Sequence, residues 1–272
     1  MVDRDRYSET FARLGQRGEG AFVPFVVLGD PDPDASLAIT RTLVRAGADA
    51  LELGIPFSDP VADGPTIQAA DIRALRAGMR PARGLAIVHA LRAEFPDLPI
   101  GLLVYANLVV ARGARAFYEA AAAAGVDSVL VADVPTVEAE PFVEAAGDEG
   151  VLPVLIATPT CSGAHLEKVA RLTRGYTYVV TRAGVTGADR TAQTDHRLLC
   201  DRLRELGAAP PVLGFGISRP EHVRAALAAG AAGAISGSAV VRLVEDNLGD
   251  PEATARAIEG FVKAMKAATR QR

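Results

Sequence analysis

The sequence predicts an α/β fold, a single (β/α)8 TIM barrel. Two observations predict it. Short apolar segments, often β-branched, recur eight times along the chain, which is typical of parallel strands buried on both faces. A helical pattern and a glycine-containing turn separate these segments over about 250 residues, the usual length of such a barrel. An open, doubly wound sheet is the alternative, because the order of elements does not show closure.

The elements follow in order from the N-terminus. A helix over 3–16 is expected to cover the bottom of the barrel. The apolar segments predict strands at 21–27, 49–54, 99–104, 126–132, 151–157, 176–181, 211–215 and 232–236. The helical patterns cover 35–46, 64–76, 81–94, 113–124, 137–147, 163–173, 195–206 and 219–229. Two helices follow the last strand, and the first, over 237–246, is an extra short one. No linker divides the chain, so we expect residues 1–272 to form one domain.

Composition excludes several classes of protein. The 272 residues are 49% hydrophobic and 23% charged, with a net charge of −4, which argues against nucleic acid as a partner. The N-terminus is charged from its third residue, unlike a signal peptide, and no apolar run reaches the roughly 20 residues of a membrane span. Cys161 and Cys200 form no CxxC motif and fit reduced thiols. We expect a soluble, cytoplasmic protein.

Residues 51–68, LELGIPFSDPVADGPTIQ, contain three acidic residues and no basic one. Side-chain alternation puts Glu52 on the face opposite Leu51 and Leu53, so we expect it to point into the barrel near the end of the second strand. Asp59 and Asp63 follow in the loop, at the end of the barrel where sites lie. A buried carboxylate needs a partner or a function. A structural ion pair of Glu52, for example with Arg182, is the alternative.

Other proton-handling groups lie away from this end. Lys168, Lys263 and Lys266 fall in predicted helices, which argues against Schiff-base chemistry. All four histidines also fall in helical stretches or at their starts, so neither a histidine-ligated metal nor a histidine base is expected. Cys161 follows the fifth strand and is interpreted as an incidental loop thiol. Carboxyl groups therefore remain as the proton carriers, with no metal.

Three glycine-rich turns, at 182–188, 214–218 and 235–239, follow the predicted sixth, seventh and eighth strands. Glycine lets backbone N–H groups approach an anion, and a short helix after the eighth strand adds a favourable dipole. Barrels often bind phosphate at this place. The turns therefore predict a phosphorylated ligand, with Ser238 supplying a hydroxyl group.

These segments together resemble the tryptophan synthase alpha chain family. The stretch ALELGIPFSDPVADGPTIQ is similar to the family's signature, and the similarity continues in order through 20–31, 100–109, 125–135, 174–188, 214–218 and 229–241. The resemblance implies a lyase that cleaves indole-3-glycerol phosphate to indole and D-glyceraldehyde 3-phosphate in L-tryptophan biosynthesis. It also implies a beta-chain partner carrying pyridoxal phosphate, an alpha2beta2 assembly, and no cofactor in this chain.

The resemblance implies roles for individual residues. Glu52 and Asp63 would be the catalytic pair, in which Glu52 moves protons and Asp63 accepts the indole N–H. Because Glu52 leaves a buried strand, we expect desolvation to raise its pKa toward neutrality. Asp63 follows in a loop beside backbone N–H groups, so we expect it to stay ionised. Asp59 would lie in the loop that faces the beta chain. The indole pocket would be lined by Phe25, Leu103, Tyr105, Ala132, Ile156, Tyr178 and Phe215. The phosphate would be surrounded by Thr186, Gly187, Gly216, Gly237 and Ser238.

Two departures from the family pattern occur. The turn after the fifth strand, ATPTCSGAH (157–165), lacks the proline-rich form of the family, and Val61 stands where leucine is usual. Neither touches the proposed catalytic pair. Two other functions stay open: a free-standing indole-3-glycerol-phosphate lyase, and a phosphate-binding barrel subunit without activity.

Overall fold

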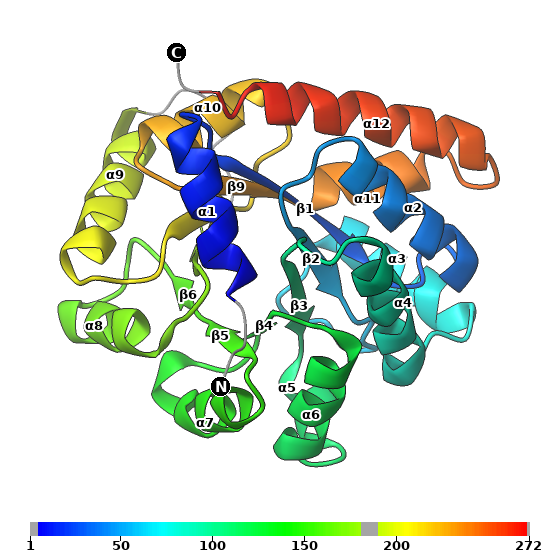
Figure 1. Ribbon diagram of the computed structural model, residues 1–272, viewed down its shortest axis with the longest axis horizontal. Coiled ribbons are helices and arrows are strands. Elements are labelled where there is room, and N and C mark those ends of the chain that lie inside the picture. Colours follow the sequence, from blue (N-terminus) through cyan, green and yellow to red (C-terminus); the bar gives the residue numbers. More distant parts are fainter. Residues whose placement is uncertain (1–4, 181–189, 271–272) are drawn as a thin grey trace.

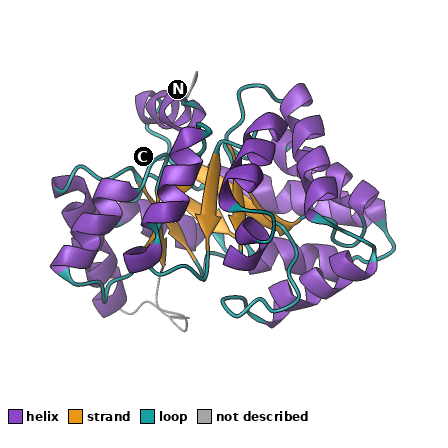
Figure 2. Cartoon of the chain, turned by 90° about the horizontal axis from the view of Figure 1, so that it is seen from below, coloured by secondary structure: helices purple, strands orange, loops and turns teal. Residues whose placement is uncertain are grey.

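The computed structural model describes the backbone of residues 5–180 and 190–270, and the side chains of 190–195 lie outside the described part. A parallel sheet of nine strand segments forms its centre, in the order β5-β4-β3-β2-β1-β9-β8-β7-β6, with helices around it (Figures 1 and 2). The segments are β1 (Ala21–Val27), β2 (Leu51–Gly54), β3 (Ile100–Val104), β4 (Ser128–Val131), β5 (Leu152–Val154), β6 (Ile156–Ala157), β7 (Thr177–Val180), β8 (Pro211–Gly214) and β9 (Gly233–Ser236).

The sheet closes through an interrupted strand. β5 pairs with β4, β6 pairs with β7, and only Leu155 separates β5 from β6 in the chain. The Leu155 carbonyl accepts the N–H of Tyr178 at 3.1 Å, which continues the pairing across the interruption. β5 and β6 are therefore two halves of the single strand predicted over 151–157. The predicted (β/α)8 barrel is confirmed, and the open sheet is excluded.

The helices lie where the sequence predicts them, within a few residues. They are α1 (Arg6–Gln16), α2 (Pro33–Arg45), α3 (Pro65–Arg76), α4 (Pro81–Glu94), α6 (Ala114–Ala124), α7 (Glu140–Asp148), α8 (Gly163–Leu172), α9 (Arg190–Glu205), α10 (Pro220–Ala228), α11 (Ser238–Glu245) and α12 (Pro251–Ala267). The sequence missed α5 (Ala106–Val110), which is too short to show a helical period. The single helix predicted over 137–147 is two elements in the structure, the 3-10 helix η1 (Thr136–Glu138) and α7.

Several helix starts follow directly from local sequence. Asp32 caps α2, accepting the N–H groups of Asp34 and Ala35, and Pro33 occupies the first turn, where its missing N–H costs nothing. Asp250 and Pro251 repeat this arrangement at α12. No helix in the described part of the chain is long and apolar enough to cross a membrane.

One layer of the barrel interior determines where the site can form. Phe25, Glu52, Gly101 and Ser128 are neighbours in register across β1, β2, β3 and β4. A Cβ atom at Gly101 would lie 2.7 Å from Ser128 Oγ and 2.9 Å from the Tyr7 hydroxyl oxygen. The glycine therefore leaves room inside the barrel for Tyr7, which comes from outside the sheet.

Helix α1 covers the amino end of the barrel, as the sequence predicts (Figure 1). The Tyr7 hydroxyl group hydrogen-bonds to Ser128 Oγ at 2.9 Å, and the Tyr7 ring packs against Tyr176 with 5.3 Å between ring centroids. The amino end is therefore filled by aromatic side chains. The carboxyl ends of the strands remain for binding.

Candidate active site

Glu52 points into the barrel from β2, as side-chain alternation predicts, and only 1% of its surface is exposed. Its Oε1 accepts a hydrogen bond from the Tyr176 hydroxyl group at 2.7 Å. Burial, with a smaller contribution from the negative charge of Asp63, raises the pKa of Glu52 to about 7 against the opposing effect of the Tyr176 hydrogen bond. The pKa therefore lies near neutrality, as the sequence predicts. The alternative partner, Arg182, lies outside the described residues.

Asp63 lies in the loop between β2 and α3. Its Oδ2 accepts a hydrogen bond from the Tyr105 hydroxyl group at 2.7 Å, and that hydroxyl oxygen accepts the N–H of Ala62 at 3.1 Å. Burial raises the pKa of Asp63, and the Tyr105 hydrogen bond opposes the rise. The sequence predicted backbone N–H donors that would favour the ionised form. The donor found among the described residues is the Tyr105 phenol instead, and burial has the larger effect on the pKa.

A cavity of about 130 Å³ brings the two carboxyl groups together with much of the predicted pocket. Phe25, Leu103, Tyr178 and Phe215 line it, and Tyr178 and Phe215 meet edge to face. The other lining residues are Gly64, Ile67, Gly216, Ile217, Ser218, Ile235, Gly237, Ser238 and Ala239. Glu52 and Asp63 therefore lie in one apolar cavity, which is also lined by the glycine turns after β8 and β9.

The glycine turns after β8 and β9 place backbone atoms at the edge of this cavity. Phe215 and Gly216 both adopt positive φ, of 65° and 71°, so the chain reverses sharply after β8. Gly237 precedes the first turn of α11, and a Cβ there would lie 3.3 Å from the Phe25 ring. The N–H groups that open a helix have no partner within it. The start of α11, with Ser238, therefore offers donors to an anion.

The remaining predicted residues lie elsewhere. Tyr105 contacts Asp63 and does not line the cavity, and Asp59 is exposed in the loop, where the Ser58 hydroxyl group donates to it at 2.5 Å. Ala132 and Ile156 line a different cavity. Thr186 and Gly187 lie outside the described residues.

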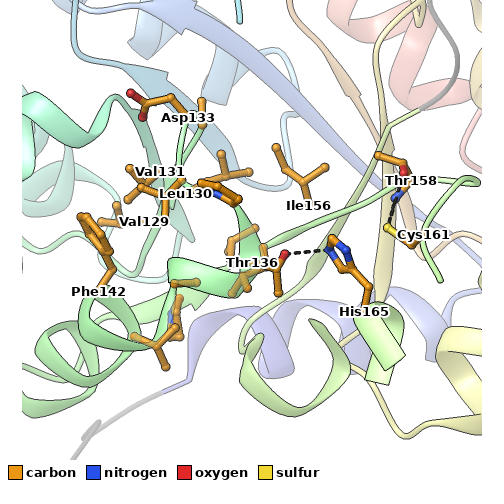
Figure 3. A pocket seen from close by; sticks show the side chains of 18 of the residues that line it. Val129, Leu130, Val131, Asp133, Thr136, Phe142, Ile156, Thr158, Cys161 and His165 are labelled. Atoms are coloured by element: carbon orange, nitrogen blue, oxygen red, sulfur yellow. Dashed lines mark hydrogen bonds between the residues drawn. The ribbon is translucent and has the colours of Figure 1, made fainter. Parts of the chain in front are cut away.

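The second cavity, of about 380 Å³, lies beside β4 at the interruption between β5 and β6 (Figure 3). Val129 and Phe142 line one side, while His165 and Cys161 come from the opposite side. His165 Nε2 bonds to Thr136 Oγ1 at 2.9 Å, and Cys161 Sγ accepts the N–H of Thr158 at 3.4 Å. Both hydrogen bonds join residues that line the cavity. They fit the interpretation of Cys161 as a loop thiol.

Sequence reasoning missed Tyr176 as a partner of Glu52. Tyr176 and Tyr178 are two positions apart, and both side chains are buried. Side chains two positions apart in a strand point to the same face, so Tyr176 could have been predicted to point into the barrel together with the predicted pocket residue Tyr178. The described residues also include no group of three or more His, Cys, Asp or Glu side chains that could hold a metal ion.

The fold and this cavity define a class: a (β/α)8 barrel with two carboxyl groups and an open helix start in one cavity at the carboxyl ends of its strands. A family model described as "Tryptophan synthase alpha chain" matches residues 11–270. The chain belongs to the tryptophan synthase alpha chain family. It is therefore a lyase subunit of tryptophan biosynthesis, and the reaction is the cleavage of indole-3-glycerol phosphate.

Individual relatives agree with this family. The chain is 55% identical to the tryptophan synthase alpha chain of Vibrio vulnificus (strain YJ016), over 98% of this chain and 100% of that one. The protein of the same name from Pectobacterium atrosepticum is 54% identical over 98% and 99% of the two chains. Among solved structures, the Legionella pneumophila tryptophan synthase subunit alpha is 28% identical, with a TM-score of 0.89 over 98% of each chain.

A structure described as a tryptophan synthase complex is also similar. It comes from Pyrococcus furiosus, and the matched chain is 35% identical with a TM-score of 0.81. The match covers 91% of this chain and 98% of that one. The fold described above is thus the fold of solved tryptophan synthase chains.

Proposed function

We propose that Glu52 carries the protons of the cleavage reaction and that Asp63 stabilises the charge which develops on the indole ring. One observation supports this proposal above all. The Glu52 carboxyl group is almost completely buried, has a pKa of about 7 and lies in the same cavity as Asp63. A group with a pKa near the working pH both gives and takes protons efficiently.

The proposed steps need no electron sink beyond the substrate. Glu52 donates its proton to the third carbon of the indole ring, and the positive charge passes to the ring nitrogen, whose N–H donates to Asp63. Ionised Glu52 then takes the proton of the hydroxyl group on the adjacent glycerol carbon. The bond between ring and glycerol breaks, its electron pair restores the aromatic ring, and the hydroxyl-bearing carbon becomes the aldehyde of glyceraldehyde 3-phosphate.

We assign the rest of the substrate to the residues around the acids. Phe25, Leu103, Tyr178 and Phe215 form the indole pocket, and Tyr105 holds Asp63 toward it. Ala132 and Ile156, which line the second cavity, are proposed to extend the pocket, because Ile156 pairs with the pocket residue Tyr178. The phosphate is assigned to the donors at Gly216, Gly237 and Ser238, together with Thr186 and Gly187. The start of α11 supports this assignment, because a helix N-terminus favours an anion.

We further propose a beta-chain partner that carries pyridoxal phosphate, in an alpha2beta2 assembly in the cytoplasm, with residues 1–272 as one domain. Val61, in the loop that contains Asp59, is 81% exposed, and Val137 of η1 is also exposed. Both follow strand ends on the side of the cavity. We assign both side chains to the surface that contacts the beta chain. The similar complex from Pyrococcus furiosus supports such a partner.

The test is the cleavage of indole-3-glycerol phosphate by the purified chain, followed as indole and glyceraldehyde 3-phosphate, with and without a purified beta chain. We expect cleavage in both mixtures and a faster rate with the beta chain. Equal rates in both would favour a free-standing lyase. Binding of glycerol phosphate without cleavage in either mixture would favour the inactive barrel subunit and overturn the proposal.

The chain is also expected to work without metal or imine chemistry, because none of the described residues that line the cavity is a lysine or histidine. A chelator should leave the cleavage rate unchanged. Borohydride should trap no covalent adduct with the substrate. Loss of activity with the chelator, or an adduct found by mass spectrometry, would contradict the mechanism.

A further inference from the structure

Arg73, in the last turn of α3, joins three elements that surround the active cavity. Its Nε and Nη2 donate to the two carboxylate oxygens of Asp30, at 2.7 and 3.0 Å. Its Nη1 donates to Glu245 Oε1 at 3.1 Å. Asp30 follows β1, and Glu245 is the last residue of α11. One guanidinium group therefore holds α3 both to the loop after β1 and to α11.

The buried member of this group fixes its geometry. The Asp30 side chain is 3% exposed and takes both of its hydrogen bonds from Arg73 in a fork, which sets the plane of the guanidinium group as well as its place. The remaining nitrogen, Nη1, is thereby aimed at Glu245. Lysine carries a single point of charge and cannot hold two acids in this way.

The same elements supply walls of the active cavity. Phe25 of β1, Ile67 of α3 and Ser238 of α11 all line it. Asp63 stands two positions before the first residue of α3, and Ser238 is the first residue of α11. A shift of α11 relative to α3 would therefore change the distance between Asp63 and the donors at the start of α11, while leaving each of the two places intact.

A further polar contact joins the two helices near the start of α3. Arg242 Nη2 of α11 donates to Thr66 Oγ1 at 3.3 Å, and this contact is exposed to solvent. Long, exposed contacts of this kind hold a geometry weakly. The contact between Arg73 and Glu245 is shorter, and it is oriented by the buried Asp30. Arg73 is therefore the better fixed of the two connections.

We propose that Arg73 is a positioning residue for the cleavage reaction: by joining α3 to α11, it sets the distance between Asp63 and the phosphate donors of α11. A substrate that spans both places gains from both only when this distance fits its length. A ligand that reaches one place alone is insensitive to the distance. This inference rests on the proposed function, which assigns the indole N–H to Asp63 and the phosphate to the start of α11.

The test uses two substitutions that keep Asp30 beside a cation. Glu245→Ala removes the connection to α11 and leaves the pair of Arg73 and Asp30. Arg73→Lys keeps the charge but loses the fork. Arg73→Ala is not suitable, because it would leave a buried carboxylate without its partner and destabilise the fold. Each variant is first compared with the parent by circular dichroism and urea titration.

Glu94→Ala and Arg41→Lys are the matched controls. Glu94 is the last residue of α4, as Glu245 is of α11, and Arg41 of α2 donates to it from Nε at 2.7 Å. The two glutamates are similarly exposed, at 32% and 39%. The control pair therefore also joins two helices, but neither of its residues lines the active cavity.

Three ligands are titrated into each protein by calorimetry or NMR: glycerol 3-phosphate, indole, and an unreactive analogue in which a saturated three-carbon chain joins the indole ring to phosphate. We expect Glu245→Ala and Arg73→Lys to bind the two separate ligands within about twofold of the parent and the linked analogue about tenfold more weakly. The kcat/KM for indole-3-glycerol phosphate should also fall about tenfold, because small displacements of positioned groups slow a reaction by up to about 10²-fold. The controls should match the parent for every ligand.

The separate ligands make this pattern specific to a distance between two places. Unchanged affinity for the linked analogue in both variants would overturn the proposal. So would an equal loss for glycerol 3-phosphate alone, or an equal loss in the controls, because the contact would then act on the phosphate site or on general stability. If the parent binds none of the ligands, the proposed function fails as well. If the parent binds all of them and the variants behave like the parent, only the role of Arg73 fails.

Discussion

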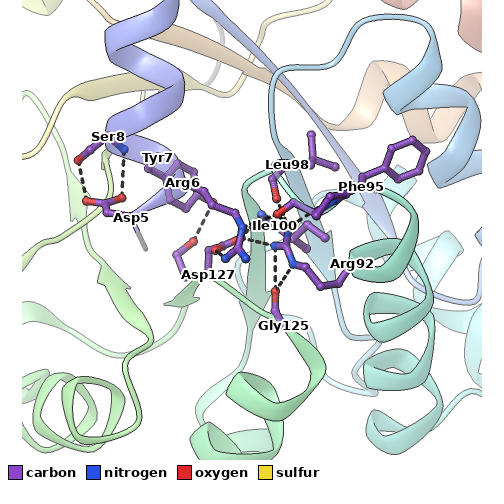
Figure 4. A network of polar contacts seen from close by, with 12 residues as sticks. Asp5, Arg6, Tyr7, Ser8, Arg92, Phe95, Leu98, Ile100, Gly125 and Asp127 are labelled. Carbon is purple, nitrogen blue, oxygen red and sulfur yellow. Dashed lines mark hydrogen bonds and ion pairs between the residues drawn. The ribbon is translucent and has the colours of Figure 1, made fainter. Parts of the chain in front are cut away.

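Two buried acids at opposite ends of the barrel have opposite surroundings. Asp127, at the amino end, accepts from Arg6 at 2.8 Å, from Arg92 at 2.5 Å and from the N–H of Ile100 at 2.7 Å (Figure 4). Within the described part of the chain, Glu52 accepts one hydrogen bond, from the Tyr176 phenol. Both are almost completely buried, at 7% and 1% exposure. The difference teaches that a buried carboxylate held by two cations serves structure, whereas Glu52, which no described cation contacts, fits the proposed exchange of protons.

The network around Asp127 has an evident structural purpose. Arg6 belongs to α1 and also donates to the Pro96 carbonyl at 2.7 Å, while Arg92 of α4 donates to the carbonyls of Gly125 and Leu98. The two guanidinium groups thus join α1 and α4 to the starts of β3 and β4. This is the end of the barrel where buried polar contacts serve stability.

The largest expected effect is on Glu52→Gln, which keeps the shape but cannot carry a proton. We expect kcat for cleavage to fall by about 10²–10⁴-fold, the contribution of general acid–base catalysis. Binding of a phosphate-bearing analogue, measured by calorimetry, should stay within a few-fold of the parent. A fall in kcat of less than about tenfold, or ~1.4 kcal/mol, would assign Glu52 to structure and break the comparison.

Asp63→Asn should lower kcat by about 10²-fold, because the variant no longer stabilises the positive charge that develops on the indole ring in the transition state. Asparagine can still interact with the Tyr105 hydroxyl group, so the fold should persist. Single-turnover kinetics separates this loss from substrate binding. An unchanged chemical step would remove Asp63 from the proposed pair.

Asp127→Asn should show the reverse pattern. It leaves two partly buried guanidinium groups without their carboxylate, and we expect the free energy of unfolding to fall by about 3 kcal/mol. Urea titration followed by circular dichroism measures this change. The kcat of the folded protein should remain within twofold of the parent. A large loss of kcat at unchanged stability would contradict the assignment of Asp127 to structure and of Glu52 to catalysis.

The lack of a cation beside Glu52 among the described residues should itself appear in stability. The pKa of Glu52 is raised from 4.5 to about 7, so folding is disfavoured progressively above pH 4.5, with the full cost present above pH 7. Glu52→Gln should therefore unfold like the parent at pH 4 and be more stable by about 3 kcal/mol at pH 8. Urea titrations at the two pH values test this, and an equal difference at both would contradict it.

The smallest effect concerns Tyr176→Phe. The Tyr176 hydrogen bond lowers the pKa of Glu52, so its loss should raise that pKa and shift the alkaline decline of kcat/KM to higher pH. One hydrogen bond to a buried group is worth about 1 kcal/mol, so the shift should be about one pH unit or less. A shift toward lower pH would show that Tyr176 does not act on the protonation of Glu52 in this way.

Much of the fold follows from local sequence alone. The eight predicted strands, the major helices and the inward direction of Glu52 all depend on which residues face the core. The spacing of apolar residues along the chain indicates that face. The glycine turns likewise fall at strand ends because glycine permits the backbone conformations needed there. The order of elements, and the acids that lie at the end of the second strand, were therefore predictable from neighbouring residues.

Only the closed barrel decided what these groups contact. Tyr176 is 124 positions from Glu52, and Tyr105 is 42 positions from Asp63, so no local pattern pairs them. Ala132 and Ile156 line a second cavity beside the interruption at Leu155, and the packing of α3 buries Asp71. Burial and the distance to other charges set the pKa of an acid. Both are properties of the folded barrel, so the sequence determined which acids are present and the tertiary structure decided which of them keep a proton near neutral pH.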